Sequence, residues 1–127
     1  MPAGASYAFE EFARRHGDFA IVGVAAMVAL DGTRCRDARL AAAGVGPVPM
    51  RLRAAEEILV KDGVGERAIE AAAARAAELV NPDSDLHASA AYRRNLTRVL
   101  TARALTRALA RAAERPARAA ERPEGRG

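Results

Sequence analysis

The sequence predicts an α+β domain in which a small antiparallel sheet of two to three strands is covered by helices on one face. Two observations lead to this prediction. A continuous apolar run at residues 19–30, rich in β-branched side chains, is followed directly by Asp31-Gly32, which is a strong signal for a tight hairpin. After residue 53, apolar residues recur at helical spacing in successive segments.

The first predicted element is a short helix over residues 7–15. In that conformation Phe9, Phe12 and Ala13 share one side. Gly17 ends the helix, because glycine readily takes the positive φ that helix ends often need.

Two long strands follow, with a shorter third. The first spans 19–30, and the tight turn at Asp31-Gly32 reverses the chain into a return strand from about 35 to 45. Glycines and prolines interrupt the pattern there, which leaves room for a short strand or extended arm over 48–52.

Two helices are predicted next. The first begins at residue 54 and ends at the Asp62-Gly63 pair, with Glu56, Glu57 and Lys61 expected to face water. The second spans about 66–80, and its apolar stripe consists mostly of alanine.

The last predicted helix is the longest. Ser89 is its candidate N-cap, because a serine hydroxyl accepts a hydrogen bond from a free backbone N–H of the first turn. Apolar residues continue at helical spacing up to about Glu114. We therefore predict a folded domain at 7–114, a disordered start at 1–6 and a disordered tail at 115–127, where prolines replace the apolar stripe.

Composition predicts a domain that depends on partners. Half of the 127 residues are hydrophobic, but only 4% are aromatic, and alanine supplies much of the apolar share. Because alanine buries little area, and burial contributes roughly 25 cal/mol per Å² of apolar surface, the core gains little from each residue. We expect the domain to be more stable when docked on a neighbour.

Arginine dominates the positive charge. The formal net charge is +4, and Lys61 is the only lysine. Arg107, Arg111 and Arg115 are spaced four apart and so share one face of the last helix. That face is either solvated or in contact with a partner subunit, or it neutralises nucleic-acid phosphates. No aromatic residue lies among these arginines, which favours a solvated or partner-contacting face over one that binds nucleic acid.

Few residues are suited to metal or thiol chemistry. Cys35 is the only cysteine, which excludes an internal disulfide. Its neighbours Arg34 and Arg36 favour a lowered thiol pKa, whereas an inert strand residue is the simpler interpretation. His16 and His87 are too few and too far apart in sequence to indicate a metal site.

The sequence has no sign of a membrane segment or a secretion signal. It has no apolar run of roughly 18 residues, the length needed to span a bilayer. Residues 1–10 lack the basic start and apolar core of a signal peptide. We therefore predict a cytoplasmic protein.

Two stretches resemble a known family. They are Tyr7-Ala-Phe-Glu-Glu-Phe-Ala-Arg-Arg-His-Gly-Asp-Phe-Ala20, and Asp85-Leu-His-Ala-Ser-Ala-Ala-Tyr-Arg-Arg-Asn-Leu96 followed by Arg103-Ala-Leu105. Both are similar to the C-terminal domain of the FAD-binding medium subunit of molybdenum hydroxylases, the xanthine dehydrogenase and aerobic carbon monoxide dehydrogenase family. The resemblance covers about residues 7–110 and implies a small antiparallel sheet packed against a three-helix bundle.

The resemblance also implies a set of residues near the flavin. In relatives, the segment equivalent to Arg14-Arg15-His16-Gly17-Asp18 lies near the isoalloxazine ring. The guanidinium groups of Arg14 and Arg15 would stabilise a reduced, anionic flavin or attract an anionic acceptor, and Asp18 would orient one of them. Glu10 completes the cofactor-binding set, with no catalytic residue and no metal ligand. The alternative is a solvated helix end in which Asp18 caps the start of the strand.

The family context implies FAD as cofactor and three partners. These are the FAD-binding N-terminal domain, a [2Fe-2S] small subunit and a molybdopterin large subunit, with no membrane and no nucleic acid involved. The main FAD-binding domain is expected upstream of Met1, so we expect no catalysis and weak or no FAD binding from this chain alone. The alternative is a small basic interaction protein whose arginine-rich C-terminal helix and tail bind nucleic acid or an acidic partner.

Overall fold

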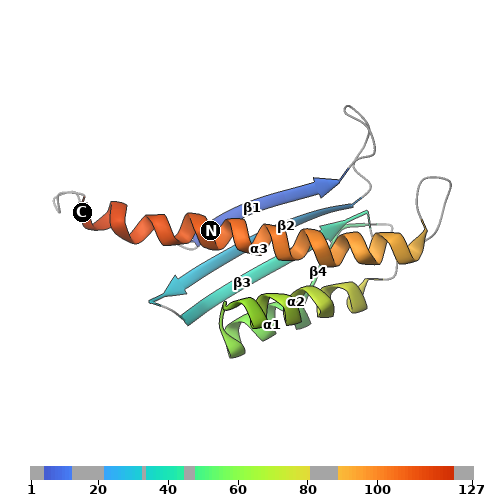
Figure 1. Cartoon of the computed structure of the whole chain (residues 1–127), viewed down its shortest axis with the longest axis horizontal. Coiled ribbons are helices and arrows are strands. Elements are labelled where there is room, and N and C mark those ends of the chain that lie inside the picture. Colours follow the sequence, from blue (N-terminus) through green and yellow to red (C-terminus); the bar gives the residue numbers. More distant parts are fainter. Residues whose placement is uncertain (1–4, 13–21, 33, 45–47, 81–88, 122–127) are drawn as a thin grey trace.

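A computed structural model describes the backbone at residues 5–12, 22–32, 34–44, 48–80 and 89–121, and the side chains of these segments up to residue 113. Within these residues the chain folds into an α+β domain, as predicted (Figure 1). Its elements, in chain order, are β1 (Ala5–Phe12), β2 (Val22–Asp31), β3 (Arg34–Ala43), β4 (Met50–Arg51), α1 (Arg53–Asp62), α2 (Glu66–Leu79) and α3 (Ala90–Glu121).

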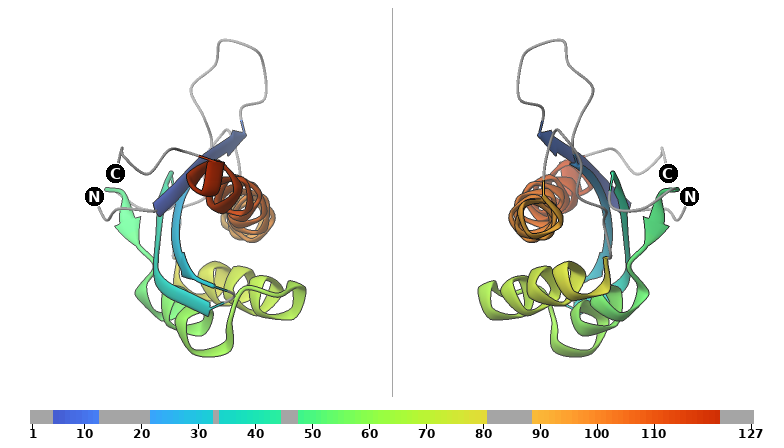
Figure 2. Two further views of the ribbon diagram at one scale, coloured as in Figure 1. Left: turned by 90° about the vertical axis from the view of Figure 1, so that its left-hand side faces the viewer. Right: turned by 90° about the vertical axis from the view of Figure 1, so that its right-hand side faces the viewer.

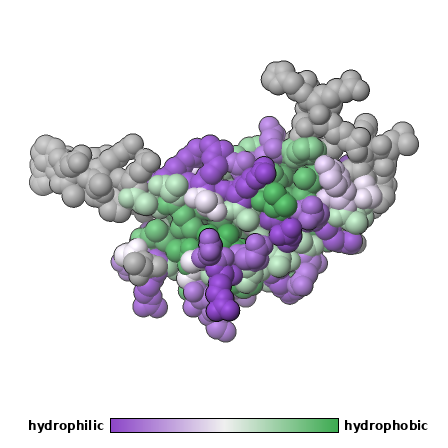
Figure 3. Space-filling view, in the orientation of Figure 1, coloured by the Kyte–Doolittle hydropathy of each residue, from purple (hydrophilic) through white to green (hydrophobic). Residues whose placement is uncertain are grey.

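The strands form an antiparallel sheet in the order β1-β2-β3-β4. The helices lie on one face of it (Figure 2). α3 packs on β1 and β2, α1 packs on β3, and α2 lies against both of the other helices. On the helix-covered side, apolar residues are visible in patches among hydrophilic ones (Figure 3). The predicted two-layer arrangement is therefore confirmed.

The helix predicted over 7–15 is wrong where the structure describes it, because residues 5–12 form strand β1. Alanine, glutamate and arginine favoured a helix locally, but β1 gains a full antiparallel ladder with β2, from Ala5 opposite Ala29 to Phe12 opposite Val22. Phe9 and Phe12 consequently lie on opposite faces of the sheet rather than on one side of a helix.

The hairpin between the central strands is confirmed. Asp31 pairs with Arg34, and Gly32 has a φ of 66°, in the left-handed region that glycine adopts without strain. The return strand β3 matches the prediction closely, and the short fourth strand, Met50–Arg51, lies inside the expected 48–52.

The first two helices also match their predictions. Gly63 ends α1 with a φ of 97°, and its N–H donates to the carbonyl of Leu59 at 2.9 Å. For α3, the N–H of Tyr92 donates to the Ser89 hydroxyl at 3.0 Å, which confirms the N-cap.

The end of α3 differs from the prediction. The helix extends to Glu121, past the expected boundary at 114, because alanine and arginine favour helix even without an apolar stripe. Residues 122–127 and 1–4 lie outside the described residues, so the domain boundaries stay predictions.

The core is built largely from alanine and β-branched residues. Val22, Val24 and Val28 of β2 are fully buried beneath the helices. Ala72 of α2 and Ala104 of α3 have no exposed surface either. Small side chains let helices approach closely, but each buries little apolar area, so the hydrophobic stabilisation per residue is low.

Glu56 was expected to face water, and this was wrong: the residue is 5% exposed. Its carboxylate accepts the N–H of Leu40 at 2.8 Å and is bound by the Arg51 guanidinium through Nε and Nη2, each at 2.9 Å. The hydrogen bonds from Arg51 to Glu56, and the negative charge of that carboxylate, raise the pKa of Arg51. Because β4 is short, this carboxylate takes the place of a strand partner for β3 and holds α1 against the sheet.

Replacing Glu56 tests this role. Glu56→Ala should lower the free energy of unfolding by about 1–3 kcal/mol, because the buried Leu40 N–H loses its acceptor. Glu56→Gln retains an acceptor and should lose less. Urea unfolding followed by circular dichroism measures both. The matched control is Glu57→Ala, one position along the same helix and exposed, and equal losses for the two alanine variants would contradict the assignment.

Candidate functional site

One end of the domain brings together the two sequence stretches that carry the family resemblance. The Phe12 ring at the end of β1 meets the Tyr92 ring at the start of α3 edge to face, with centroids 6.2 Å apart and planes at 83°. Phe12 also pairs with Val22 of β2. Phe12 and Val22, the described residues on either side of segment 13–21, therefore lie beside the first turn of α3 (Figure 1).

Of the predicted flavin-site residues, the structure describes one. Arg14, Arg15 and Asp18 lie outside the described residues. Glu10 is on β1, on the side facing α3, where its carboxylate pairs with the Arg107 guanidinium and is 16% exposed. In the described part of the chain, Glu10 therefore pairs with Arg107 of α3. Its contact with a flavin stays a prediction.

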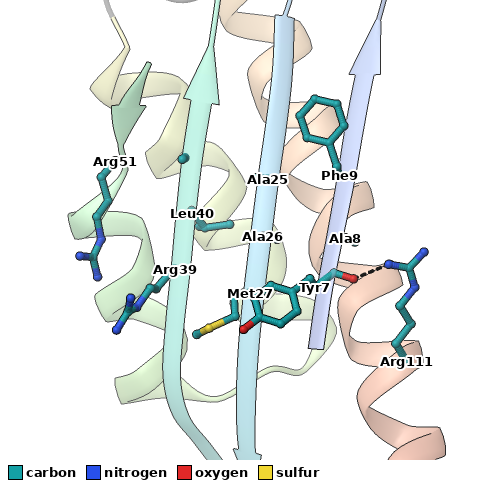
Figure 4. A pocket seen from close by; sticks show the side chains of 11 residues that line it. Tyr7, Ala8, Phe9, Ala25, Ala26, Met27, Arg39, Leu40, Arg51 and Arg111 are labelled. Atoms are coloured by element: carbon teal, nitrogen blue, oxygen red, sulfur yellow. Dashed lines mark hydrogen bonds between the residues drawn. The ribbon is translucent and has the colours of Figure 1, made fainter. Parts of the chain in front are cut away.

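The arginine face of α3 contacts β1. Besides the Arg107–Glu10 pair, Arg111 donates to the backbone carbonyl of Tyr7 at the outer edge of β1 (Figure 4). These two side chains fasten α3 to the edge strand, where exposed backbone groups would otherwise invite pairing with another chain. Two members of the series therefore make contacts within the domain, which counts against a row of free cations for nucleic-acid phosphates.

The face of the sheet opposite the helices contains a hollow of about 560 Å³. Its floor is apolar and comes from β1, β2 and β3, as Figure 4 shows. Phe9 on this face is 55% exposed. The residues that line the hollow are Tyr7, Ala8, Phe9, Ala25, Ala26, Met27, Arg39, Leu40, Ala41, Arg51 and Arg111.

Sequence reasoning missed this surface because it placed Tyr7 and Phe9 on a helix. The available signal was alternation. Tyr7 and Phe9 alternate with Ala8 and Glu10, which is the pattern of a strand with two distinct faces. Aromatic residues also favour strands over helices.

The described residues offer little for thiol, metal or membrane chemistry. Cys35 is buried in β3, its Sγ–H donates to the carbonyl of Asp37 at 3.2 Å, and burial raises the pKa of the thiol rather than lowering it, which favours the interpretation as a strand residue. Within the described ranges, no group of three or more His, Cys, Asp or Glu residues is placed to hold a metal ion. No helix in the described part of the chain is long and apolar enough to cross a membrane.

The sequence has clear relatives. It is 41% identical to the 6-hydroxypseudooxynicotine dehydrogenase complex subunit alpha of Paenarthrobacter nicotinovorans, over 88% of this chain and 38% of that subunit. It is 32% identical to the carbon monoxide dehydrogenase medium chain of Afipia carboxidovorans, over 87% of this chain and 38% of the relative. The chain thus spans well under half the length of these relatives.

Solved structures show the same fold. Carbon monoxide dehydrogenase from Hydrogenophaga pseudoflava superimposes with a TM-score of 0.82 at 32% identity, covering 87% of this chain and 39% of that one. Quinoline 2-oxidoreductase from Pseudomonas putida 86 gives 0.81 at 35% identity, with the same coverage.

The fold and the open sheet face define a two-layer α+β domain that occurs within larger oxidoreductase subunits. A family described as the CO dehydrogenase flavoprotein C-terminal domain matches residues 7–108, and the chain belongs to this family. The resemblance to medium subunits of molybdenum hydroxylases is therefore confirmed.

The buried thiol supports a kinetic prediction. At pH 8, Cys35 in the folded chain should react with a disulfide reagent at least about tenfold more slowly than in urea, because burial disfavours the thiolate. Because the pKa of Cys35 is raised in the folded chain, the unfolded chain loses the thiol proton at a lower pH than the folded chain does. This thiol therefore leaves the free energy of unfolding unchanged below the ordinary thiol pKa. Above that pKa it should lower the free energy of unfolding as the pH rises. Equal reaction rates in the folded and unfolded states, measured by absorbance, would show that the thiol is accessible.

Proposed function

We propose that this chain is the C-terminal domain of the FAD-binding subunit of a molybdopterin-dependent hydroxylase. The single observation that carries the proposal is the family match across residues 7–108. In this role the domain forms one wall of the flavin site. It supports electron transfer from [2Fe-2S] clusters in a small subunit, through FAD, to an external acceptor. The hydroxylation itself takes place at a molybdopterin centre in a large subunit.

The residues that serve the flavin are assigned to the segment between β1 and β2. Arg14 and Arg15 supply positive charge that stabilises a reduced, anionic flavin or attracts an anionic acceptor. Asp18 orients one of these guanidinium groups through paired hydrogen bonds. The Phe12–Tyr92 contact supports this assignment, because it anchors the start of the segment to α3.

The described residues by themselves do not fit a complete FAD site. The carboxylate of Glu10 is already neutralised by Arg107, and the hollow on the sheet is apolar with an arginine rim. Most contacts to the dinucleotide must then come from the part of the subunit that precedes this domain in relatives. We therefore infer that the chain alone neither retains FAD nor catalyses a reaction.

Reconstitution tests the proposal. The probe is the part of the Paenarthrobacter nicotinovorans subunit that precedes its matching region, called the upstream part below. Mixed with FAD and desalted, the chain alone should emerge colourless. Together with the upstream part it should co-elute and retain the yellow absorbance of FAD. Failure to co-elute would overturn the proposed function.

A double variant tests the flavin-site residues separately. Arg14→Ala with Arg15→Ala should leave co-elution intact but lower the flavin reduction potential. A loss of about 30 mV corresponds to tenfold weaker stabilisation of the two-electron reduced form. Arg103→Ala, an exposed arginine on α3, is the matched control. An unchanged potential would place the flavin away from segment 13–21 without affecting the proposed domain role.

A further inference from the structure

An aromatic contact between β1 and α3 lies at the base of the segment assigned to the flavin. Phe12 is the last residue of β1, and Tyr92 belongs to the first turn of α3. Their rings meet edge to face, an arrangement that aromatic pairs favour because the positive edge of one ring points at the negative face of the other. The contact therefore helps to fix where the chain leaves β1.

Tyr92 is itself held by the start of its helix. Its N–H donates to the Ser89 hydroxyl at 3.0 Å, and the N–H of Arg93 donates to the Ser89 carbonyl at 3.0 Å. One turn further along the same side of α3, Leu96 is buried in the core. The ring of Tyr92 thus stands on a turn that is fixed both by its cap and by the core.

The exposure of Tyr92 indicates a role other than filling the core. Tyr92 is 38% exposed, whereas Val22, which pairs with Phe12 across the sheet, has no exposed surface. Phe12 lies between them and is partly buried against the core. A half-exposed ring contributes less hydrophobic stabilisation than a fully buried one. Loss of the Tyr92 ring should therefore leave the fold intact and loosen the end of β1.

Phe12 is close in the chain to the arginines assigned to the flavin. Arg14 follows it by two residues and Arg15 by three. Covalent geometry keeps the Cα atoms of Phe12 and Arg14 within about 7 Å of each other. The effect of a charge on a flavin falls with distance, so a guanidinium acts reliably only where the neighbouring residues hold it in place.

We propose that Tyr92 is a positioning residue for the flavin site. Through Phe12, its ring holds Arg14 and Arg15 where their charge stabilises the reduced flavin. The proposal rests on the proposed function and adds a residue of α3 to it. Because the contact is made by the ring, phenylalanine should replace Tyr92 without loss, whereas alanine should not.

The flavin reduction potential tests the proposal in the full chain combined with FAD and the upstream part. Tyr92→Ala should weaken stabilisation of the reduced flavin by about threefold or more, which is roughly 14 mV, and Tyr92→Phe should keep the original potential. Adding Tyr92→Ala to the Arg14→Ala, Arg15→Ala variant should cause no further loss, because Tyr92 acts through these arginines. Asn95→Ala, at an exposed position one turn along α3, is the matched control.

Hydrogen exchange provides a second readout that needs no flavin. In the chain alone, amides at residues 9–12 should exchange about two- to tenfold faster in the Tyr92→Ala variant, since an aromatic pair makes a modest contribution to local stability. Tyr92→Phe and Asn95→Ala should leave the exchange unchanged. Melting curves by circular dichroism verify that each variant is folded.

Each other outcome overturns the proposal in a different way. An unchanged potential in the Tyr92→Ala variant would refute it directly. An equal loss in the Tyr92→Phe variant would assign the effect to the hydroxyl instead of the ring. A further loss on top of the double arginine variant would show that Tyr92 acts independently of those residues. Unchanged exchange at 9–12 would show that Tyr92 does not hold the end of β1.

The same experiments separate this proposal from the proposed function. Co-elution of the unmodified chain with the upstream part and FAD leaves the proposed function standing, even where the Tyr92 variants refute the positioning role. An unchanged potential in the Arg14→Ala, Arg15→Ala variant would remove the charge through which Tyr92 acts, and with it the positioning role alone. Absence of co-elution would remove both proposals.

Discussion

A strand directs successive side chains to opposite faces of its sheet, and this alternation is the constraint on which the rest of the domain depends. Along β2, Val24 and Val28 point to the helices, whereas Ala25 and Met27 point away from them. Both faces of the strand are apolar, but the helices in the described chain lie on one face. The same geometry therefore produces a core beneath the helices and a second apolar group on the other face, where Met27 is buried and Phe9 and Ala25 are exposed.

Polar contacts compensate for a core made largely of small residues. Glu56 joins α1 to β3 through the Leu40 N–H, and Arg107 joins α3 to β1 through Glu10. Each contact connects elements distant in sequence, so each fixes how a helix lies on the sheet rather than whether the helix forms. This is consistent with a domain that gains further stability from a neighbour, which its alanine content also indicates.

β1 connects the segment proposed to approach the flavin with the sheet face opposite the helices. Its end, Phe12, leads into the segment that carries Arg14, Arg15 and Asp18, and its outward residues belong to the open face.

The α+β class, the hairpin at Gly32, the three helices and the family were all predictable from the sequence, because turn chemistry, helical periodicity and motif order are local properties of the chain. Tertiary structure alone decided three points. Residues 7–12 became a strand because pairing with β2 outweighed helix propensity, Glu56 became buried because β3 needed an acceptor, and Phe9 became exposed because the helices cover the opposite face. Each of these outcomes depends on partners far away in the sequence, and local patterns do not record which distant partner a residue will meet.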